Sequence, residues 1–202
     1  MAQEKLEEQF RSWAEKRGVP IIREESHELL RELVEKYNPK HILEIGTAVG
    51  YSGITMLESS NADLITIELK PESAEEAKSN FEKVGFSDRV NVVNADCCSY
   101  VIELLLDDSN IQKFDFIFLD GPKAQYLNLY PTLYELLAPN GVLVADNVLF
   151  RGYVENPSDA PRRFKTIYQR LKKFIDLCQT SGDFKFVKLH RIEDGVLECV
   201  KK

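Results

Sequence analysis

The stretch HILEIGTAVGYS, His41 to Ser52, joins a short apolar run to a glycine-containing turn and then to the start of a helix. The run HILEI reads as a buried strand because it is short and mostly apolar. Gly46 and Gly50 then let the backbone turn tightly and approach a ligand before the helix starts. The stretch therefore predicts a strand, a turn facing a ligand, and a helix.

The same alternation continues along the chain. Apolar strands are expected at 41–45, 64–69, 89–95, 114–120 and 141–146. Helices are expected at about 2–17, 24–37, 50–58, 71–85, 98–107 and 124–137. Strands rich in Val, Ile and Leu that alternate with helices are typical of a parallel sheet covered on both faces.

The pattern changes after a long basic helix expected at about 160–180. The segments 184–190 and 196–202 flank Asp194-Gly195, which predicts an antiparallel hairpin. The predicted fold class is α/β, a Rossmann-like, doubly wound, seven-stranded sheet that ends in this hairpin. We expect a single domain over 1–202, with 1–38 as a helical cover and 39–202 as the core. In such sheets ligands bind beyond the carboxyl ends of the strands.

Composition narrows the class of protein. The chain has 202 residues, of which 44% are hydrophobic and 29% charged, as in soluble globular domains. No apolar run approaches the roughly 20 residues that span a bilayer, and the charged N-terminus is unlike a secretory signal, so a cytoplasmic location without membrane contact is expected. The four cysteines form no CxxC pair and the histidines are scattered, which predicts reduced, mostly buried thiols rather than a zinc site.

Charge is unevenly distributed along the chain. The net charge of −7 argues against a nucleic-acid partner, but the segment 151–173 holds seven basic and two acidic residues. The seven are Arg151, Arg162, Arg163, Lys165, Arg170, Lys172 and Lys173. This excess is either a footprint for phosphate groups or the solvated face of a helix, and composition leaves both interpretations open.

Carboxylates at the first three strand ends favour a nucleoside ligand that carries a cation. Glu68 follows Gly50 by 18 residues and suits the hydroxyls of a ribose, and Asp96 follows the third strand, where an adenine can bind. A dinucleotide would require GxGxxG, whereas this turn is GxxxG. Glu44 suits an amino group better than a pyrophosphate. S-adenosylmethionine is therefore favoured over a nicotinamide dinucleotide, and hence over an oxidoreductase, although the glycines alone fit a plain turn equally well.

The fourth and fifth strands end in further oxygen ligands. Asp120 follows one strand and Asp146-Asn147 follows the other. If these strands are neighbours, two carboxylates and an amide converge, a donor set suited to a hard cation such as Mg²⁺. Taken singly, the aspartates are equally compatible with a helix cap, and Asp-Asn with a turn. A non-catalytic interaction module would need no such set.

Four motifs carry a family resemblance that extends from about residue 20 to the hairpin. The segments ILEIGTAVGYS, ITIEL, FLDGPKAQY and VLVADNVLFRG resemble the cation-dependent O-methyltransferases, the group that contains the catechol and caffeoyl-coenzyme A enzymes. The resemblance implies a class I S-adenosylmethionine-dependent fold. It also implies that Asp120, Asp146 and Asn147 bind Mg²⁺ or another divalent cation. Lys123, with Asp120, would be catalytic and would assist deprotonation of the substrate hydroxyl.

The same resemblance implies a set of cofactor-binding residues. Glu44 would hold the methionine moiety of S-adenosylmethionine and Ser52 would lie near its carboxylate. Glu68 would hold the ribose and Asp96 would lie near the adenine. Gly46 and Asp120 complete the expected cofactor-binding set: Glu44, Gly46, Ser52, Glu68, Asp96 and Asp120.

Within the family, the compact length and the pattern DNVLFRGYV…RR look most like bacterial tRNA 5-hydroxyuridine methyltransferases. The main expectation is therefore methylation of O5 of 5-hydroxyuridine at the wobble position, giving 5-methoxyuridine. The basic segment 151–173 would then contact the anticodon loop. Tyr126, Phe150 and Tyr153 would stack on the base or, equally, pack in the core or in a dimer contact. The alternative acceptor is a small catechol-like phenol, and a homodimer is expected.

Overall fold

The computed structural model describes Ser12 and the residues 22–107 and 113–202. Apart from Ser12, the helix expected over 2–17 lies outside the described residues. Of the predicted helical cover, the described part is the segment that begins at Ile22 and contains helix α2.

Within the described residues, the strands form one seven-stranded sheet in the order β3-β2-β1-β4-β5-β7-β6. The strands are β1 (His41–Ile45), β2 (Asp63–Glu68), β3 (Val90–Asn94), β4 (Phe114–Leu119), β5 (Leu137–Ala145), β6 (Phe184–His190) and β7 (Val196–Lys201). The first five pair in parallel, and β7 runs antiparallel to both β5 and β6. The predicted fold class and hairpin are confirmed, and the strand order switches between β1 and β4.

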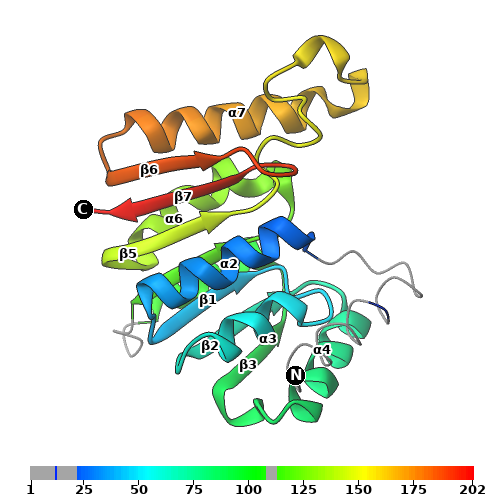
Figure 1. Ribbon diagram of the computed structural model, residues 1–202, viewed down its shortest axis with the longest axis vertical. Helices are drawn as coiled ribbons and strands as arrows, with labels where there is room; N and C mark the ends of the chain where they lie inside the picture. Colours follow the sequence, from blue (N-terminus) through cyan, green and yellow to red (C-terminus); the bar gives the residue numbers. More distant parts are fainter. Residues whose placement is uncertain (1–11, 13–21, 108–112) are drawn as a thin grey trace.

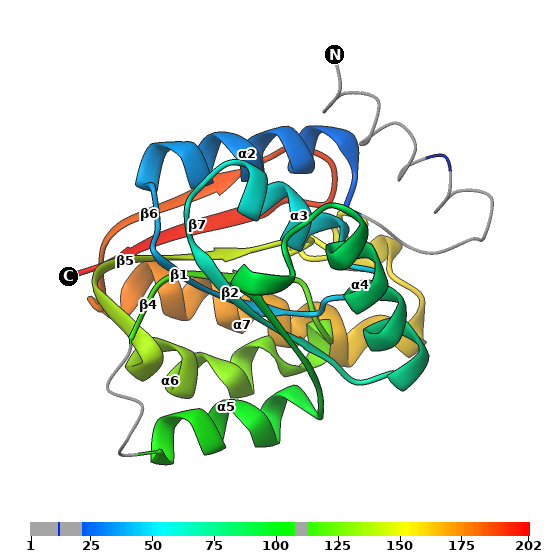
Figure 2. The same ribbon diagram turned by 90° about the horizontal axis from the view of Figure 1, so that it is seen from below.

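Helices cover both faces of the sheet. They are α2 (Glu24–Tyr37), α3 (Tyr51–Glu58), α4 (Pro71–Lys83), α5 (Cys97–Leu106), α6 (Tyr126–Leu136) and α7 (Lys165–Thr180). Short 3₁₀ turns are η1 (Ser87–Arg89), η2 (Lys123–Gln125), η3 (Pro157–Asp159) and η4 (Arg162–Phe164). Helices α2, α3 and α4 lie on one face, and α5, α6 and α7 lie on the other (Figures 1 and 2). Among the helices described, none has the length and apolar character to cross a membrane.

The strands divide their side chains between two apolar cores. In β4, Phe116 and Phe118 join the core beneath α2 and α3, whereas Ile117 and Leu119 join the core beneath α5, α6 and α7. This division follows from the two-residue period of a strand, which points successive side chains to opposite faces. Because both faces are buried, every residue of β4 from Phe116 to Leu119 is at most 1% exposed.

Strand β5 begins earlier than the sequence predicts. Expected from Gly141, it starts at Leu137, which pairs with Phe114 before the register shifts. Asn140 adopts a left-handed conformation (φ 64°) within this irregular part. Pro139 and Asn140 are unfavourable in regular strands, and for that reason the sequence pattern hides the beginning of β5.

The turn between β6 and β7 joins three distant parts of the chain. The Glu193 carboxylate accepts hydrogen bonds from the Ser26 backbone N–H (3.2 Å) and hydroxyl (2.7 Å) at the start of α2. Asp194 accepts one from the backbone N–H of Arg151 (3.2 Å) and pairs with Arg23 (3.2 Å). The turn therefore holds the entry to α2 and the loop after β5 together.

Candidate functional site

A cavity of about 660 Å³ lies beyond the carboxyl ends of β1 to β5, at the switch in strand order. Its size is within the range of small-molecule and cofactor sites. Of the residues predicted from the sequence, those on its wall are Gly46, Glu68, Asp96, Asp120, Lys123, Asp146 and Asn147. The structure therefore brings together the residues expected at the ends of five different strands.

The glycine at position 46 is required by close backbone packing. Gly46 has φ 104°, and a side-chain carbon there would lie 2.5 Å from the carbonyl oxygen of Asp120. Its N–H and that of Thr47 both donate to the carbonyl of Ile67. The turn after β1 is thereby pressed between the ends of β2 and β4, and its backbone lines the cavity.

Glu68 is held in place by backbone amides. Its carboxylate accepts hydrogen bonds from the N–H groups of Ala48 and Lys70, both at 2.9 Å. Since a carboxylate has about four acceptor positions, further lone pairs are available to ligand hydroxyls in the cavity. This arrangement suits the predicted contact with a ribose.

Glu44 and Ser52 do not line the cavity. The Glu44 side chain is fully buried beneath α3 and accepts hydrogen bonds from the hydroxyls of Ser52 and Thr66, both at 2.5 Å. Burial raises the pKa of Glu44 to about 7, although these two hydrogen bonds oppose the rise. Strand alternation turns Glu44 under the helix, so Glu44 and Ser52 lie behind the cavity wall, and the cofactor-binding roles expected for them stay predictions.

Asp96 has two roles in the structure. It is the N-cap of α5, where its carboxylate accepts a hydrogen bond from the Ser99 backbone N–H (3.0 Å). It also lines the cavity, between Ala95 and Cys97. The capping interaction and a place beside a bound ligand are therefore compatible.

Asp120, Asp146 and Asn147 converge at one edge of the cavity. Leu119 and Ala145 are paired in register, and the Asp146 backbone N–H donates to Leu119 (3.0 Å), so the residues that follow the two strands lie side by side. Asp146 is only 1% exposed, and burial together with the Asp120 carboxylate raises its pKa to about 6. Asn147 adopts a left-handed conformation (φ 56°), and its N–H donates to the Asp146 carboxylate (2.7 Å).

This donor set fits a hard divalent cation. Burial and, after it, repulsion by the Asp120 carboxylate raise the pKa of Asp146, and a bound cation would offset both effects. Within the described residues, no three His, Cys, Asp or Glu side chains gather as a metal site. The set is therefore two carboxylates with the amide of Asn147, which suits Mg²⁺ with water or substrate oxygens in its remaining positions.

Lys123 lies at the same edge. Its ammonium group contacts the Asp120 carboxylate at 2.5 Å and lies 5.5 Å from the centre of the Tyr126 ring. Burial opposes the charged form, but Tyr126 and Asp120 outweigh it, so the pKa of Lys123 lies above its ordinary value. Lys123 is a cation in this arrangement.

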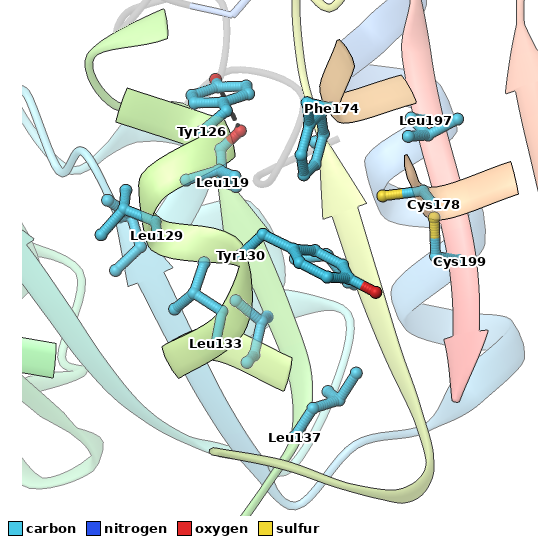
Figure 3. Packing of buried hydrophobic residues seen from close by; sticks show 14 of the residues in the cluster. Leu119, Tyr126, Leu129, Tyr130, Leu133, Leu137, Phe174, Cys178, Leu197 and Cys199 are labelled. Carbon is cyan, nitrogen blue, oxygen red and sulfur yellow. Dashed lines mark hydrogen bonds between the residues drawn. The ribbon is translucent and has the colours of Figure 1, made fainter. Parts of the chain in front are cut away.

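The aromatic residues considered for base stacking divide into two groups. Tyr126 is fully buried in the core below the site, where its hydroxyl lies 2.9 Å from the Leu119 carbonyl (Figure 3), so a stacking role for it is wrong. Phe150 and Tyr153 are partly exposed and pack with Phe164 at ring distances of 5.4–6.0 Å. The Phe150 N–H donates to the Asn147 carbonyl (3.1 Å). This cluster is therefore next to the edge of the cavity where Asp120, Asp146 and Asn147 converge.

Several residues of the cavity wall were not found from the sequence. They include Ile22, Arg23, Lys70, Ser73, Cys97, Gly121 and Pro122. Arg23 lies at the wall in the segment before α2, where it pairs with Asp194 of the hairpin turn. No local pattern in the sequence signals such a contact, whereas Gly121 and Pro122 directly follow Asp120, a predicted site residue.

Comparison with known proteins decides the family. The sequence profile of the family described as O-methyltransferase matches residues 3–202. The chain belongs to this O-methyltransferase family. Two curated caffeoyl-CoA O-methyltransferases, from Arabidopsis thaliana and Eucalyptus globulus, are 29% and 30% identical to it over 71% of the chain. The chain spans 56% and 58% of the lengths of these two relatives.

Solved structures of this O-methyltransferase family's fold agree closely with it. A Staphylococcus aureus protein provisionally named a caffeoyl-CoA O-methyltransferase has a TM-score of 0.87 and 26% identity, over 97% of this chain and 92% of that one. The Podospora anserina methyltransferase PaMTH1, solved with S-adenosylhomocysteine bound, has a TM-score of 0.85 and 26% identity, over 98% and 88%.

Proposed function

We propose that this chain transfers a methyl group from S-adenosylmethionine to a hydroxyl oxygen of a small phenol. The preferred acceptor carries a second oxygen beside the first, as a catechol does, and a divalent cation, Mg²⁺ first, assists. The observation that carries the proposal is the convergence of Asp120, Asp146, Asn147 and Lys123 at one edge of a cofactor-sized cavity. The caffeoyl-CoA relatives support a phenolic acceptor over tRNA.

The cofactor would bind at the first three strand ends. Glu68 would accept hydrogen bonds from the ribose, and Asp96 would lie beside the adenine. Glu44 and Ser52 would act from behind the wall by fixing the turn and the start of α3. When bound, S-adenosylmethionine supplies an electrophilic methyl group on its sulfonium. The chain's contribution is alignment, because methyl transfer needs near-linear geometry rather than a covalent intermediate.

The acceptor would bind at the fourth and fifth strand ends. Asp120, Asp146 and Asn147 would hold the cation, which when bound lowers the pKa of a neighbouring hydroxyl and fixes its direction. As an ammonium, Lys123 would stabilise the oxyanion of the acceptor. The other role, taking the proton of the acceptor hydroxyl, requires Lys123 to lose its own proton first, which its raised pKa opposes. Phe150 and Tyr153 would contact the acceptor ring from the loop after β5.

A second candidate acceptor is the wobble 5-hydroxyuridine of tRNA. It is favoured by exposed basic residues next to the aromatic cluster, since the Arg151 and Arg163 guanidinium groups lie 5.6 and 4.7 Å from the Phe164 ring. O5 and the neighbouring carbonyl O4 of this base can chelate a cation as a catechol does. The homodimer and the cytoplasmic location stay predictions.

The test offers purified protein and S-adenosylmethionine to catechol, to a caffeoyl thioester and to tRNA that carries 5-hydroxyuridine. Mass spectrometry then looks for the methylated products with Mg²⁺ and with a chelator. We expect methylated phenol that disappears with the chelator and after Asp146→Ala, but not after Asp176→Ala on the exposed face of α7.

Other outcomes redirect the proposal. Product from tRNA alone, falling steeply as salt rises, would replace the phenol by RNA. Methylation that persists in full with the chelator would remove the cation from the mechanism. Absence of product from all three acceptors would count against the O-methyltransferase proposal for these substrate classes.

A further inference from the structure

Helix α7 directs one of its basic side chains inward, toward the catalytic edge. Arg170 was predicted either to meet RNA phosphates or to be solvated, yet it is partly buried and its Nε donates to the carbonyl oxygen of Ala124 at 2.6 Å. Ala124 is the middle residue of η2, directly after Lys123. The Arg170 guanidinium is therefore hydrogen-bonded to the backbone of η2, the short turn that contains Lys123.

Stability alone does not account for this arrangement. The Nη2 atom of Arg170 is buried and makes no hydrogen bond to any described residue. A buried, incompletely paired charged group is unfavourable, and an apolar side chain of similar length is often as stable or more stable. The inward arginine is better explained by its hydrogen bond to the η2 turn than by a gain in stability.

The turn that Arg170 holds is weak on its own. Within η2, the Gln125 N–H donates to the Pro122 carbonyl (2.7 Å), and a single 3₁₀ turn of three residues has poor hydrogen-bond geometry. The register of α7 is fixed one turn further on, where Phe174 packs edge-on against Tyr126 at 5.7 Å (Figure 3). Arg170, one turn earlier on the same face of α7, therefore faces η2.

We propose that Arg170 is a positioning residue that anchors the η2 turn and so keeps the Lys123 ammonium against Asp120 at the acceptor end of the cavity. Its value for catalysis rests on the proposed function, in which Lys123 serves methyl transfer. The anchoring itself does not depend on that function, so the two can fail separately.

The anchoring is tested without any activity. Arg170→Met is compared with wild type and with Gln179→Met, a change at an exposed position of the same helix. Hydrogen exchange of peptides covering residues 122–126 should become at least tenfold faster in R170M only. The unfolding midpoint should stay equal or rise, because an incompletely paired charge is removed. Unchanged exchange in R170M overturns the proposal, whether or not the protein methylates phenols.

The catalytic consequence is tested by kinetics and a double-mutant cycle. R170M should lower kcat at least tenfold while KM for S-adenosylmethionine stays within twofold, and Arg170→Lys should restore part of the loss. In a Lys123→Ala background, R170M should add nothing further, since its effect passes through Lys123. Losses that simply add, or a matching rise in KM, overturn the positioning role. A wild type without activity refutes the proposed function and leaves the exchange experiment to decide the anchoring.

Discussion

The buried Glu44 makes a prediction about pH and stability. Glu44 is 0% exposed and its pKa is raised from 4.5 to about 7 by burial. The folded state therefore holds this proton more tightly than the unfolded state, and the associated stability is lost as pH rises from 4.5 through 7. Between pH 5 and pH 8 this one group should remove about 2 to 3 kcal/mol of unfolding free energy, since each pH unit of pKa difference is worth about 1.4 kcal/mol.

The perturbation is Glu44→Gln, which keeps the shape and removes the charge. As pH rises from 5 to 8, the unfolding free energy of the variant should increase by about 2 to 3 kcal/mol relative to that of wild type. This corresponds to roughly 5 to 10 °C in melting temperature. Comparing the two pH values cancels any fixed change in the hydrogen bonds from Ser52 and Thr66. Urea unfolding at both pH values measures the difference in unfolding free energy between the variant and wild type. The control is Glu82→Gln, on the exposed face of α4.

Two results would refute this reasoning. If the E44Q and wild-type stabilities keep a constant difference across the pH range, Glu44 does not titrate as its burial requires. If E44Q weakens S-adenosylmethionine binding more than tenfold in a calorimetric titration while Ser52→Ala, which removes one of the hydrogen bonds to Glu44, does not, Glu44 contacts the cofactor directly. Its place behind the cavity wall would then not describe the bound state.

Three further predictions concern the frame of the site. Gly46→Ala should lower the unfolding free energy by about 3 kcal/mol in a urea titration, because the new methyl group collides with the Asp120 carbonyl at a positive φ; an unchanged midpoint contradicts this. Asp96→Ala should lose about 1 kcal/mol of capping energy that Asp96→Asn retains. If both variants bind the cofactor as wild type does, Asp96 is only a cap. Glu198→Ala should cost about 2 kcal/mol near pH 7, because it removes a carboxylate only 1% exposed that accepts hydrogen bonds from Lys36 and Tyr37; a loss below 1 kcal/mol, measured by urea unfolding, would show that these hydrogen bonds contribute little.

Much of the fold could be predicted from the sequence because its signals are local. Apolar runs bounded by glycine, proline or aspartate gave the strands, and Asp194-Gly195 gave the hairpin. Asp120, Asp146 and Asn147 were expected to meet because parallel strands bring their carboxyl ends to one edge. That expectation required only that β4 and β5 be neighbours, as they are.

The rest of the site depends on directions and contacts that motifs do not contain. Glu44 lies between Leu43 and Ile45, which face the core beneath α5, α6 and α7, so the two-residue period of β1 turns Glu44 to the face beneath α3. The motif alone indicated a ligand contact and did not contain this direction. Arg170 shares the inner face of α7 with Phe174, four residues on, yet its charge suggested solvent. Arg23 could not have been found, since its partner Asp194 is 171 positions away.

The turn between β6 and β7 has a consequence for protein engineering. Hairpin turns at a surface are common places to insert a tag, an epitope or a second domain, since they tolerate added length. Here Glu193 and Asp194 connect the entry of α2 to the loop that follows Asn147, and Gly195 fits against Leu149 with no room for a side-chain carbon. An insertion at this turn would displace the segment before α2 and the loop after β5, both of which border the cavity. It should therefore impair ligand binding as an active-site substitution does.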